Sequence, residues 1–156
     1  KELTSTILVA FSSASSAAAL SSNLQSVQRL GASRPVSSFL IPLGNTINMD
    51  GTAIYMGVCS IFAATFFGID LTFDKQILIV IIAMLASVGT MGVPGAGVIM
   101  ISMVFTQVGI PLEAIALIAG IDRVLDMMRT TLNVLGDATG ALTVSKAEND
   151  MHPIQE

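Results

Sequence analysis

The sequence predicts an all-α membrane protein whose apolar helices are interrupted. Hydrophobic residues make up 53% of its 156 positions and charged residues only 12%, about half of the roughly 25% that soluble domains carry. No charged residue occurs between Lys75 and Glu113, and a stretch of this length without charge cannot form a water-exposed surface. Both observations favour the lipid bilayer as the surroundings of this chain.

The first segment, residues 3–30, predicts a helix followed by a Ser-rich turn. A short apolar helix over residues 3–11 continues into SSASSAAALSS at 12–22 and then into a polar second arm. By composition, the Ser-rich block fits a flexible linker. Because it carries no charge and follows an apolar helix, it also fits the tip of a re-entrant hairpin whose hydroxyls and backbone face a ligand.

The next two segments, residues 36–68 and 77–108, are apolar but broken at their centres. The first contains GNTINMDGT and the second SVGTMGVPGAG. Each segment exceeds the roughly 20 residues that span a bilayer, yet Gly and Pro at its centre interrupt regular helix. A proline kink or a loop between two spans explains a single break as well. Two breaks together favour a binding site at the bilayer midplane, where irregular backbone lines a cavity.

Residues 112–145 predict a long final helix, followed by a polar tail at 146–156. Arg29 and Arg34 lie in the first connection and Lys146 follows the last helix. Positive charge marks the cytoplasmic side of membrane proteins. We therefore expect the first connection and the tail to be cytoplasmic, in a multi-pass protein of the inner or plasma membrane.

The final helix carries a narrow polar stripe. At 100° per residue, its polar side chains fall within an arc of about 80°. These residues are Asp122, Asp126, Arg129, Asn133 and Asp137. Ionisable groups at membrane depth are costly and usually functional, so the stripe predicts a site inside the protein.

Two interpretations of the stripe stay open. Asp126 and Arg129 are spaced i,i+3 and could simply neutralise each other. Alternatively, Arg129 offers a planar fork that grips a carboxylate, while Asp126 accepts hydrogen bonds from an ammonium group. Asn133 can both donate and accept, and Asp137 and Asp50 are hard oxygen ligands suited to an alkali cation.

Other classes of function find little support. No basic patch with interleaved aromatic residues occurs, which argues against nucleic acid as a partner. The only histidine, His152, lies in the polar tail. An intramembrane aspartyl protease needs a G-x-G-D word, and Val134 stands where its first glycine would be. We expect a protein that is not an enzyme, although a channel-like membrane module remains an alternative.

Three sequence motifs resemble those of the dicarboxylate/amino acid:cation symporter family, the glutamate transporter homologues. They are PLGNTINMDGTAIY (42–55), SVGTMGVPGAG (87–97) and DRVLDMMRTTLNVLGD (122–137). The resemblance implies two re-entrant helical hairpins plus two transmembrane helices, one of them broken. Residues 1–145 would form part of the transport domain: hairpin one at 3–30, the broken helix at 36–68, hairpin two at 77–108 and the last helix at 112–145. The scaffold helices, through which the family forms homotrimers, would precede this chain, which looks like the last two-fifths of such a transporter.

The resemblance also implies the substrate, L-aspartate or L-glutamate. Asp126 would take the substrate amino group and Arg129 its side-chain carboxylate. Asn133 and the tip of hairpin one would hold the main-chain carboxylate. The implied substrate-binding residues are Ser15, Ser16, Thr52, Val93, Gly97, Asp126, Arg129, Thr130 and Asn133.

Sodium ions are the expected coupling ions, with no other cofactor, and membrane lipid is the expected surrounding partner. One sodium site would use Gly44, Asn48, Asn133 and Asp137; a second Thr46, Met49, Ser87, Val88 and Thr90; a third Asn48 and Asp50. The expected function is symport of an acidic amino acid with sodium by alternating access. Proton-coupled relatives vary the NMDGT word, so Asn48 and Met49 favour sodium; proton-coupled dicarboxylate or glutamate symport is the alternative.

One position departs from the family. Its members usually carry an arginine where this chain has Ala14 or Met127. We expect Arg123 to take over the charge balance, together with Asp122, by reaching along the helix. Pairing with Asp122, or an outward orientation toward lipid headgroups, are the alternatives.

Overall fold

The described residues form an all-helical fold, as the sequence predicts. This computed structural model describes residues 1–89, 92–149 and 151. Its helices are α1 (Thr4–Ser13), α2 (Ser16–Arg29), α3 (Arg34–Ile47), α4 (Asp50–Phe66), α5 (Phe73–Val88), α6 (Ala96–Val108) and α7 (Ala114–Ala147). The Ser-rich block is therefore helix and turn rather than an extended linker.

Helices α1 and α2 form a helical hairpin. Ala14 ends α1 in the left-handed conformation (φ 51°), and the Ser15 side chain caps α2 by accepting the Ala18 N–H at 3.2 Å. A Ser or Thr oxygen in this position satisfies a backbone donor that has no partner within the helix. Farther along, the Thr6 hydroxyl lies 2.9 Å from the Ser26 hydroxyl. These contacts hold the two arms together on either side of a tight turn.

The other apolar segments are interrupted where the sequence indicates. Asn48 and Met49 separate α3 from α4 and have non-helical backbone angles. Helix α5 ends at Val88, and α6 begins at Ala96 after Gly95, whose φ of 79° favours glycine. Helices α5 and α6 pack against each other as a second hairpin.

Three helix ends extend beyond the predicted segments. Helix α3 begins at Arg34 rather than 36. Helix α5 begins at Phe73 rather than 77, with Asp74 in its first turn. Helix α7 runs to Ala147, so the predicted tail starts inside it, with Lys146 in the last turn. An acid at a helix N-terminus and a base at the C-terminus both interact favourably with the helix dipole. Charged residues therefore extend α5 and α7 instead of ending them.

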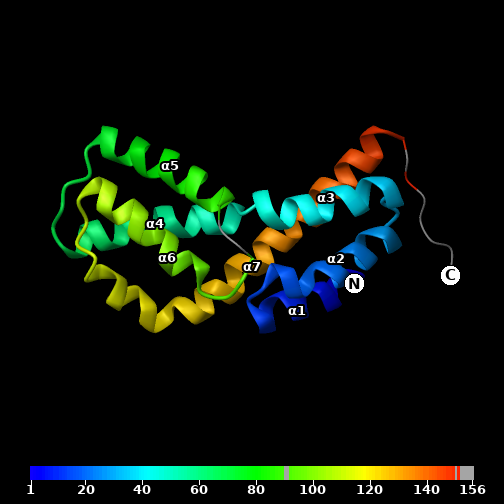
Figure 1. Cartoon of the computed structure of the whole chain (residues 1–156), viewed down its shortest axis with the longest axis horizontal. Coiled ribbons are helices and arrows are strands. Elements are labelled where there is room, and N and C mark those ends of the chain that lie inside the picture. The colour runs from blue at the N-terminus through cyan, green and yellow to red at the C-terminus, as the bar shows by residue number, and fades with distance from the viewer. Residues whose placement is uncertain (90–91, 150, 152–156) are drawn as a thin grey trace.

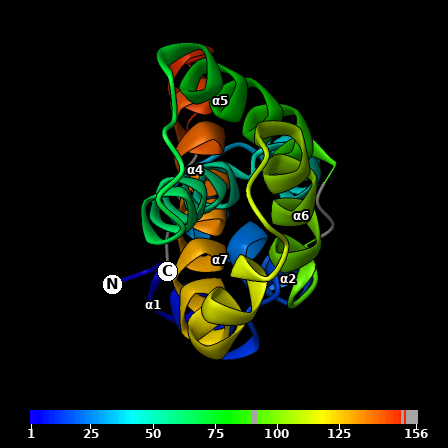
Figure 2. The same cartoon turned by 90° about the vertical axis from the view of Figure 1, so that its left-hand side faces the viewer.

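The helices form an elongated molecule in which both hairpin turns lie near the middle (Figure 1). Helix α7 runs past this region and packs against α1, α2, α3, α4 and α6. Figure 2 shows the end of the molecule where α4, α5 and α6 come together. The breaks in the chain thus surround the middle of α7, which carries the polar stripe.

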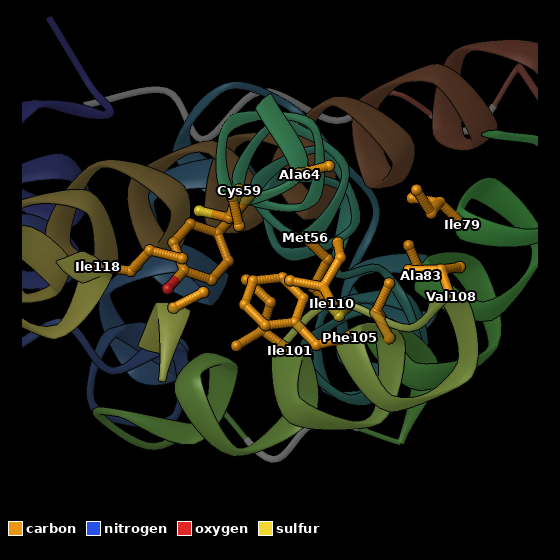
Figure 3. Packing of buried hydrophobic residues seen from close by; sticks show 14 of the residues in the cluster. Met56, Cys59, Ala64, Ile79, Ala83, Ile101, Phe105, Val108, Ile110 and Ile118 are labelled. Carbon is orange, nitrogen blue, oxygen red and sulfur yellow. The ribbon is translucent and has the colours of Figure 1, made fainter. Parts of the chain in front are cut away.

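The largest apolar core joins α4, α5, α6 and the start of α7 (Figure 3). Met56, Ile101 and Phe105 are fully buried in it, and Cys59 is a buried free thiol. Smaller clusters join α2 and α3 to α7 around Val27 and Ile41. This packing fixes α4 and α6 against α7, and so sets the walls of the central region.

Large apolar side chains also cover much of the outer surface. Exposed examples include Val58 on α4, Leu85 on α5 and Ile99 on α6. Among the described helices, one stretch, Arg34–Phe66, is long and apolar enough to cross a membrane by length and composition, with a mean hydropathy of 1.3 over its best window. Extensive exposed apolar surface marks contact with membrane or with other protein.

Candidate functional site

The polar stripe of α7 is buried, and the opposite face is exposed. Asp122, Asp126, Arg129, Asn133 and Asp137 each expose at most 8% of their surface. On the opposite face, Val124 and Met128 are more than half exposed. The helical periodicity therefore identified the inward face of α7 correctly.

Asp126 and Arg129 form an ion pair. The Asp126 Oδ1 atom lies 3.0 Å from Arg129 Nε and 2.9 Å from Nη2. The second carboxylate oxygen of Asp126 accepts the Gly95 N–H at 2.7 Å. Within the described residues, however, Arg129 Nη1 and the Ser16 hydroxyl are buried without a hydrogen-bond partner. A buried donor without an acceptor costs about 1–3 kcal/mol, so this pair is not fully satisfied.

The aromatic ring of Tyr55 also contacts the Arg129 guanidinium, in addition to Asp126. The Arg129 Cζ atom lies 4.4 Å from the centre of the Tyr55 ring, a cation–π distance. The Tyr55 hydroxyl donates to Asp122 Oδ1 at 2.7 Å, and this oxygen lies 3.8 Å from Arg129 Nη1. The sequence analysis did not assign Tyr55. Its signal was a lone tyrosine in an apolar helix, whose hydroxyl needs a partner when it is buried.

The start of α4 docks directly on α7. The Gly51 N–H donates to Asn133 Oδ1 at 2.7 Å. Asn133 Nδ2 lies 3.2 Å from Met49 Sδ and 3.3 Å from Thr52 Oγ1. A side chain at Gly51 would place its Cβ 2.6 Å from the Arg129 carbonyl oxygen. The glycine of the NMDGT word, unassigned in the sequence analysis, is therefore what lets α4 approach α7.

The two hairpin turns meet above this part of α7. The Ser15 hydroxyl donates to the Gly92 carbonyl at 2.8 Å, and the Ala17 N–H lies 3.4 Å from the same oxygen. A Cβ at Gly92 would overlap the Ser16 hydroxyl, and one at Gly97 would overlap the Arg129 guanidinium. Glycine at these positions permits the close approach of the α5–α6 hairpin to α2 and α7.

These elements enclose a small polar cavity. Its lining residues are Ser16, Met49, Thr52, Gly92, Val93, Ala96, Gly97, Asp126, Arg129, Thr130 and Asn133. All the predicted substrate residues line it except Ser15, which instead joins the hairpin turns. The volume is about 10 Å³, room for no more than about one water molecule. The site is therefore closed, and a larger ligand enters only after a wall moves.

A second group of predicted residues surrounds Asp137. Asn48 Nδ2 donates to Asp137 Oδ1 at 2.9 Å, and a Cβ at Gly44 would overlap the same carboxylate. Gly136 faces both Asn48 and Asp50, because a Cβ there would lie 2.7 Å from Asn48 Nδ2 and 3.4 Å from Asp50 Oδ2. The structure thus brings Gly44, Asn48, Asp50 and Asp137 close together.

Of the other predicted sodium ligands, Thr46 lies on α3, and Ser87 and Val88 lie at the end of α5. The hydroxyl of Thr46 donates to the Leu43 carbonyl, and that of Ser87 to the Met84 carbonyl, each within its own helix. Val88 is about half exposed. Thr90 lies outside the described residues. In the part of the chain that is described, no three His, Cys, Asp or Glu side chains gather as a metal site.

Arg123 lies away from the buried ion pair. Its side chain is exposed, and Nη2 is 3.5 Å from the carbonyl oxygen of Ser13 at the end of α1. The ion pair found for Asp122 is with Arg129. This contact with the hairpin turn was not among the three orientations considered from the sequence.

Comparison with known proteins identifies the family to which this chain is similar. Residues 1–147 match the sodium:dicarboxylate symporter family. The proton/glutamate-aspartate symporter of Escherichia coli is 40% identical over 143 residues, 92% of this chain and 33% of that protein. The proton/sodium-glutamate symport protein of Bacillus subtilis is 38% identical over 147 residues, 94% of this chain and 34% of that protein. An excitatory amino acid transporter of Caenorhabditis elegans is 43% identical over 149 residues, 93% of this chain and 30% of that protein.

The chain spans about a third of the length of these relatives. The family match covers every helix from α1 to α7 and all the residues around the closed cavity. The resemblance found in the sequence words is thereby confirmed: the chain belongs to the sodium:dicarboxylate symporter family.

Proposed function

We propose that this chain is the substrate- and ion-binding part of a secondary transporter that carries an acidic amino acid together with sodium, by alternating access. Two of the relatives are named as glutamate-aspartate or glutamate symporters and the third as an excitatory amino acid transporter, and none is named as an enzyme. The observation that carries the proposal is the buried guanidinium of Arg129. Within the described residues, its Nη1 atom has no hydrogen-bond partner, and the residue lines a cavity that is also bounded by Asp126.

The chemistry of the cavity favours a ligand with both an ammonium and a side-chain carboxylate. Asp126 and Arg129 now satisfy each other in a buried place. A ligand that separates them must supply a new partner to each, because an unpaired buried charge is strongly unfavourable. An acidic amino acid supplies an ammonium to Asp126 and a carboxylate to Arg129. A neutral amino acid lacks the second group and leaves Arg129 unpaired.

Entry of this ligand requires the α5–α6 turn to move. The contacts that hold the described part of the turn include the Gly92 carbonyl, which accepts from Ser15, and the Gly95 N–H, which donates to Asp126. An ammonium group on Asp126 competes directly with Gly95. In this proposal the turn is the lid, which opens for the substrate and closes over it.

Sodium is the proposed coupling ion and is carried with the substrate. Within the described residues, neither Asp50 nor Asp137 has an ion-pair partner. Two carboxylates beside Asn48 and the α3 backbone at Gly44 offer the hard oxygen atoms that alkali cations prefer. Asn133 links this group to the cavity through its bonds to Gly51 and Thr52, so an ion here would affect the substrate site.

The membrane arrangement is part of the proposal. A symporter is integral to a membrane, which suits the exposed apolar side chains of α4, α5 and α6. We infer a multi-pass protein of the inner or plasma membrane with α1–α2 and α5–α6 as re-entrant hairpins. Homotrimers would form through a scaffold domain, as the family resemblance implies.

Proton coupling is the second candidate, because two of the three relatives described above carry the word proton in their names. The test is binding of L-aspartate to the purified protein in detergent, titrated with sodium chloride or choline chloride at several pH values. Affinity that rises steeply with sodium supports sodium coupling. Affinity that follows pH alone supports proton coupling, and substrate-independent ion flux in liposomes supports a channel.

An Asp137→Asn variant sharpens this test. The amide keeps the size of the side chain but removes its charge, so we expect the sodium dependence of aspartate affinity to fall while binding at saturating sodium survives. A Glu113→Gln variant at the start of α7 is the matched control. An unchanged sodium titration in Asp137→Asn would rule out this residue as an ion ligand.

Tyr55→Phe should weaken L-aspartate binding by about tenfold. The substitution removes the hydrogen bond to Asp122 but keeps the ring under Arg129. A lost hydrogen bond to a charged group corresponds to about 1.5–3 kcal/mol, less where water can enter. Tyr55→Leu removes the ring as well and should weaken binding further. Equal affinities for the two variants would show that the ring does not hold Arg129.

A further inference from the structure

Arg123 joins α7 to the turn of the α1–α2 hairpin from outside the cavity. Its Nη2 atom lies 3.5 Å from the carbonyl oxygen of Ser13, the last residue of α1. Carbonyls in the last turn of a helix lack partners within the helix and carry partial negative charge. A guanidinium at this point therefore interacts favourably with the end of α1, next to the left-handed residue Ala14.

The same turn holds the proposed lid. Ser15 and Ala17 lie two and four residues after Ser13, and both donate to the Gly92 carbonyl. A chain of contacts thus runs from Arg123 to the α1–α2 turn and on to Gly92 of the α5–α6 turn, which lines the cavity. Arg123 does not line that cavity, so it would act on a ligand only through these turns.

The balance of charges near the cavity is a second way in which Arg123 can affect ligand binding. The buried group contains two carboxylates, Asp122 and Asp126, against the single guanidinium of Arg129. An acidic amino acid adds further net negative charge. Arg123 precedes Asp126 by three residues on α7, and three residues is the spacing of neighbours on a helix surface. Its positive charge therefore partly offsets the net negative charge that the cavity would carry with an acidic amino acid bound.

We propose that Arg123 is a positioning residue, which keeps the α1–α2 turn seated on α7 so that this turn can hold the α5–α6 lid closed over the substrate. This inference rests on the proposed function. It assigns to Arg123 a role in retaining the ligand, not in contacting it.

The first test compares Arg123→Gln and Arg123→Lys with wild type in sodium-driven uptake of L-aspartate by proteoliposomes. We expect Arg123→Gln to raise KM about threefold to tenfold, the range that a partly exposed hydrogen bond to a charged group represents, while the maximal rate changes less. Arg123→Lys keeps the charge and should restore part of the loss. Lys146→Gln, an exposed cation on the same helix, is the control and should match wild type.

A double-mutant cycle with Ser15→Ala tests the path. If Arg123 acts through the turn, Arg123→Gln should have a smaller effect on KM in the Ser15→Ala background, because coupled residues are not additive. Fully additive effects, or a wild-type KM in Arg123→Gln, would overturn the proposal.

Hydrogen exchange of the backbone amides at 15–19 supplies a readout that needs no substrate. Arg123→Gln should speed this exchange, and Lys146→Gln should leave it unchanged. If exchange is faster in Arg123→Gln but the wild type takes up no aspartate, the contact between Arg123 and the turn is supported and the proposed function is rejected. Unchanged exchange would reject the positioning role even if uptake is sodium-dependent.

Discussion

Arg129→Ala is expected to weaken binding of L-aspartate by about a hundredfold or more. The substitution removes the guanidinium that would hold the substrate side-chain carboxylate, and charge-assisted bidentate contacts are the strong ones in buried sites. It also leaves Asp122 and Asp126 without their shared cation. Binding of a neutral amino acid of similar size should fall much less, because that ligand gains nothing from Arg129.

The ratio of these two affinities is the decisive measurement. Both ligands are titrated on the same variant, so a loss of folded protein lowers the apparent capacity but not the ratio of affinities. Arg129→Lys provides the matched variant: it keeps a charge but loses the planar fork, and should fall between wild type and Arg129→Ala. An aspartate preference that survives in Arg129→Ala would remove the substrate assignment from this residue.

Gly51→Ala is expected to lower stability by about 1–3 kcal/mol, the usual cost of overpacking, and to weaken ligand binding as well. The added methyl group would lie 2.6 Å from the Arg129 carbonyl and 3.0 Å from Asn133 Oδ1. Because the first of these atoms is backbone, α4 itself must move away from α7. This movement breaks the bond from the Gly51 N–H to Asn133 and displaces Thr52 from the cavity wall.

Gly57→Ala is the matched control on the same helix. A Cβ at Gly57 meets no atom within 4 Å, so the substitution should be neutral or stabilise α4 by about 0.5–1 kcal/mol through helix propensity. Thermal unfolding in detergent compares the two variants, and aspartate titration follows the site. Equal unfolding temperatures for Gly51→Ala and Gly57→Ala would show that α4 does not press on α7 as described.

Periodicity and composition were enough to predict the inward face of α7. Each residue of an α-helix advances by a fixed angle of about 100°, so the spacing of Asp126, Arg129 and Asn133 alone determines that they share a face. The breaks near Asn48 and Gly95 were predictable for a similar reason, since Gly and Pro act locally on the backbone. Features that depend only on residues close together in the chain can be predicted directly from the sequence.

Contacts between distant segments were not predictable in this way. Nothing near Ser15 indicates that its hydroxyl meets the Gly92 carbonyl, and nothing near Tyr55 specifies Asp122 as its partner. Both contacts depend on how α4 and the hairpins dock on α7, which is decided by packing over the whole molecule. The role of Gly51 was missed for the same reason, because its neighbour is a backbone atom of α7.

The burial of charge on α7 also bears on how the protein is made. A single ionised side chain at the centre of a spanning helix costs about 2.5–3.5 kcal/mol in insertion experiments, and α7 carries Asp122, Asp126, Arg129 and Asp137. Helix α7 follows all its packing partners along the chain, so these are synthesised first. Tyr55, Gly95 and Asn48 are then already present to receive the charges. In the proposed membrane arrangement, insertion of α7 therefore depends on the helices that precede it.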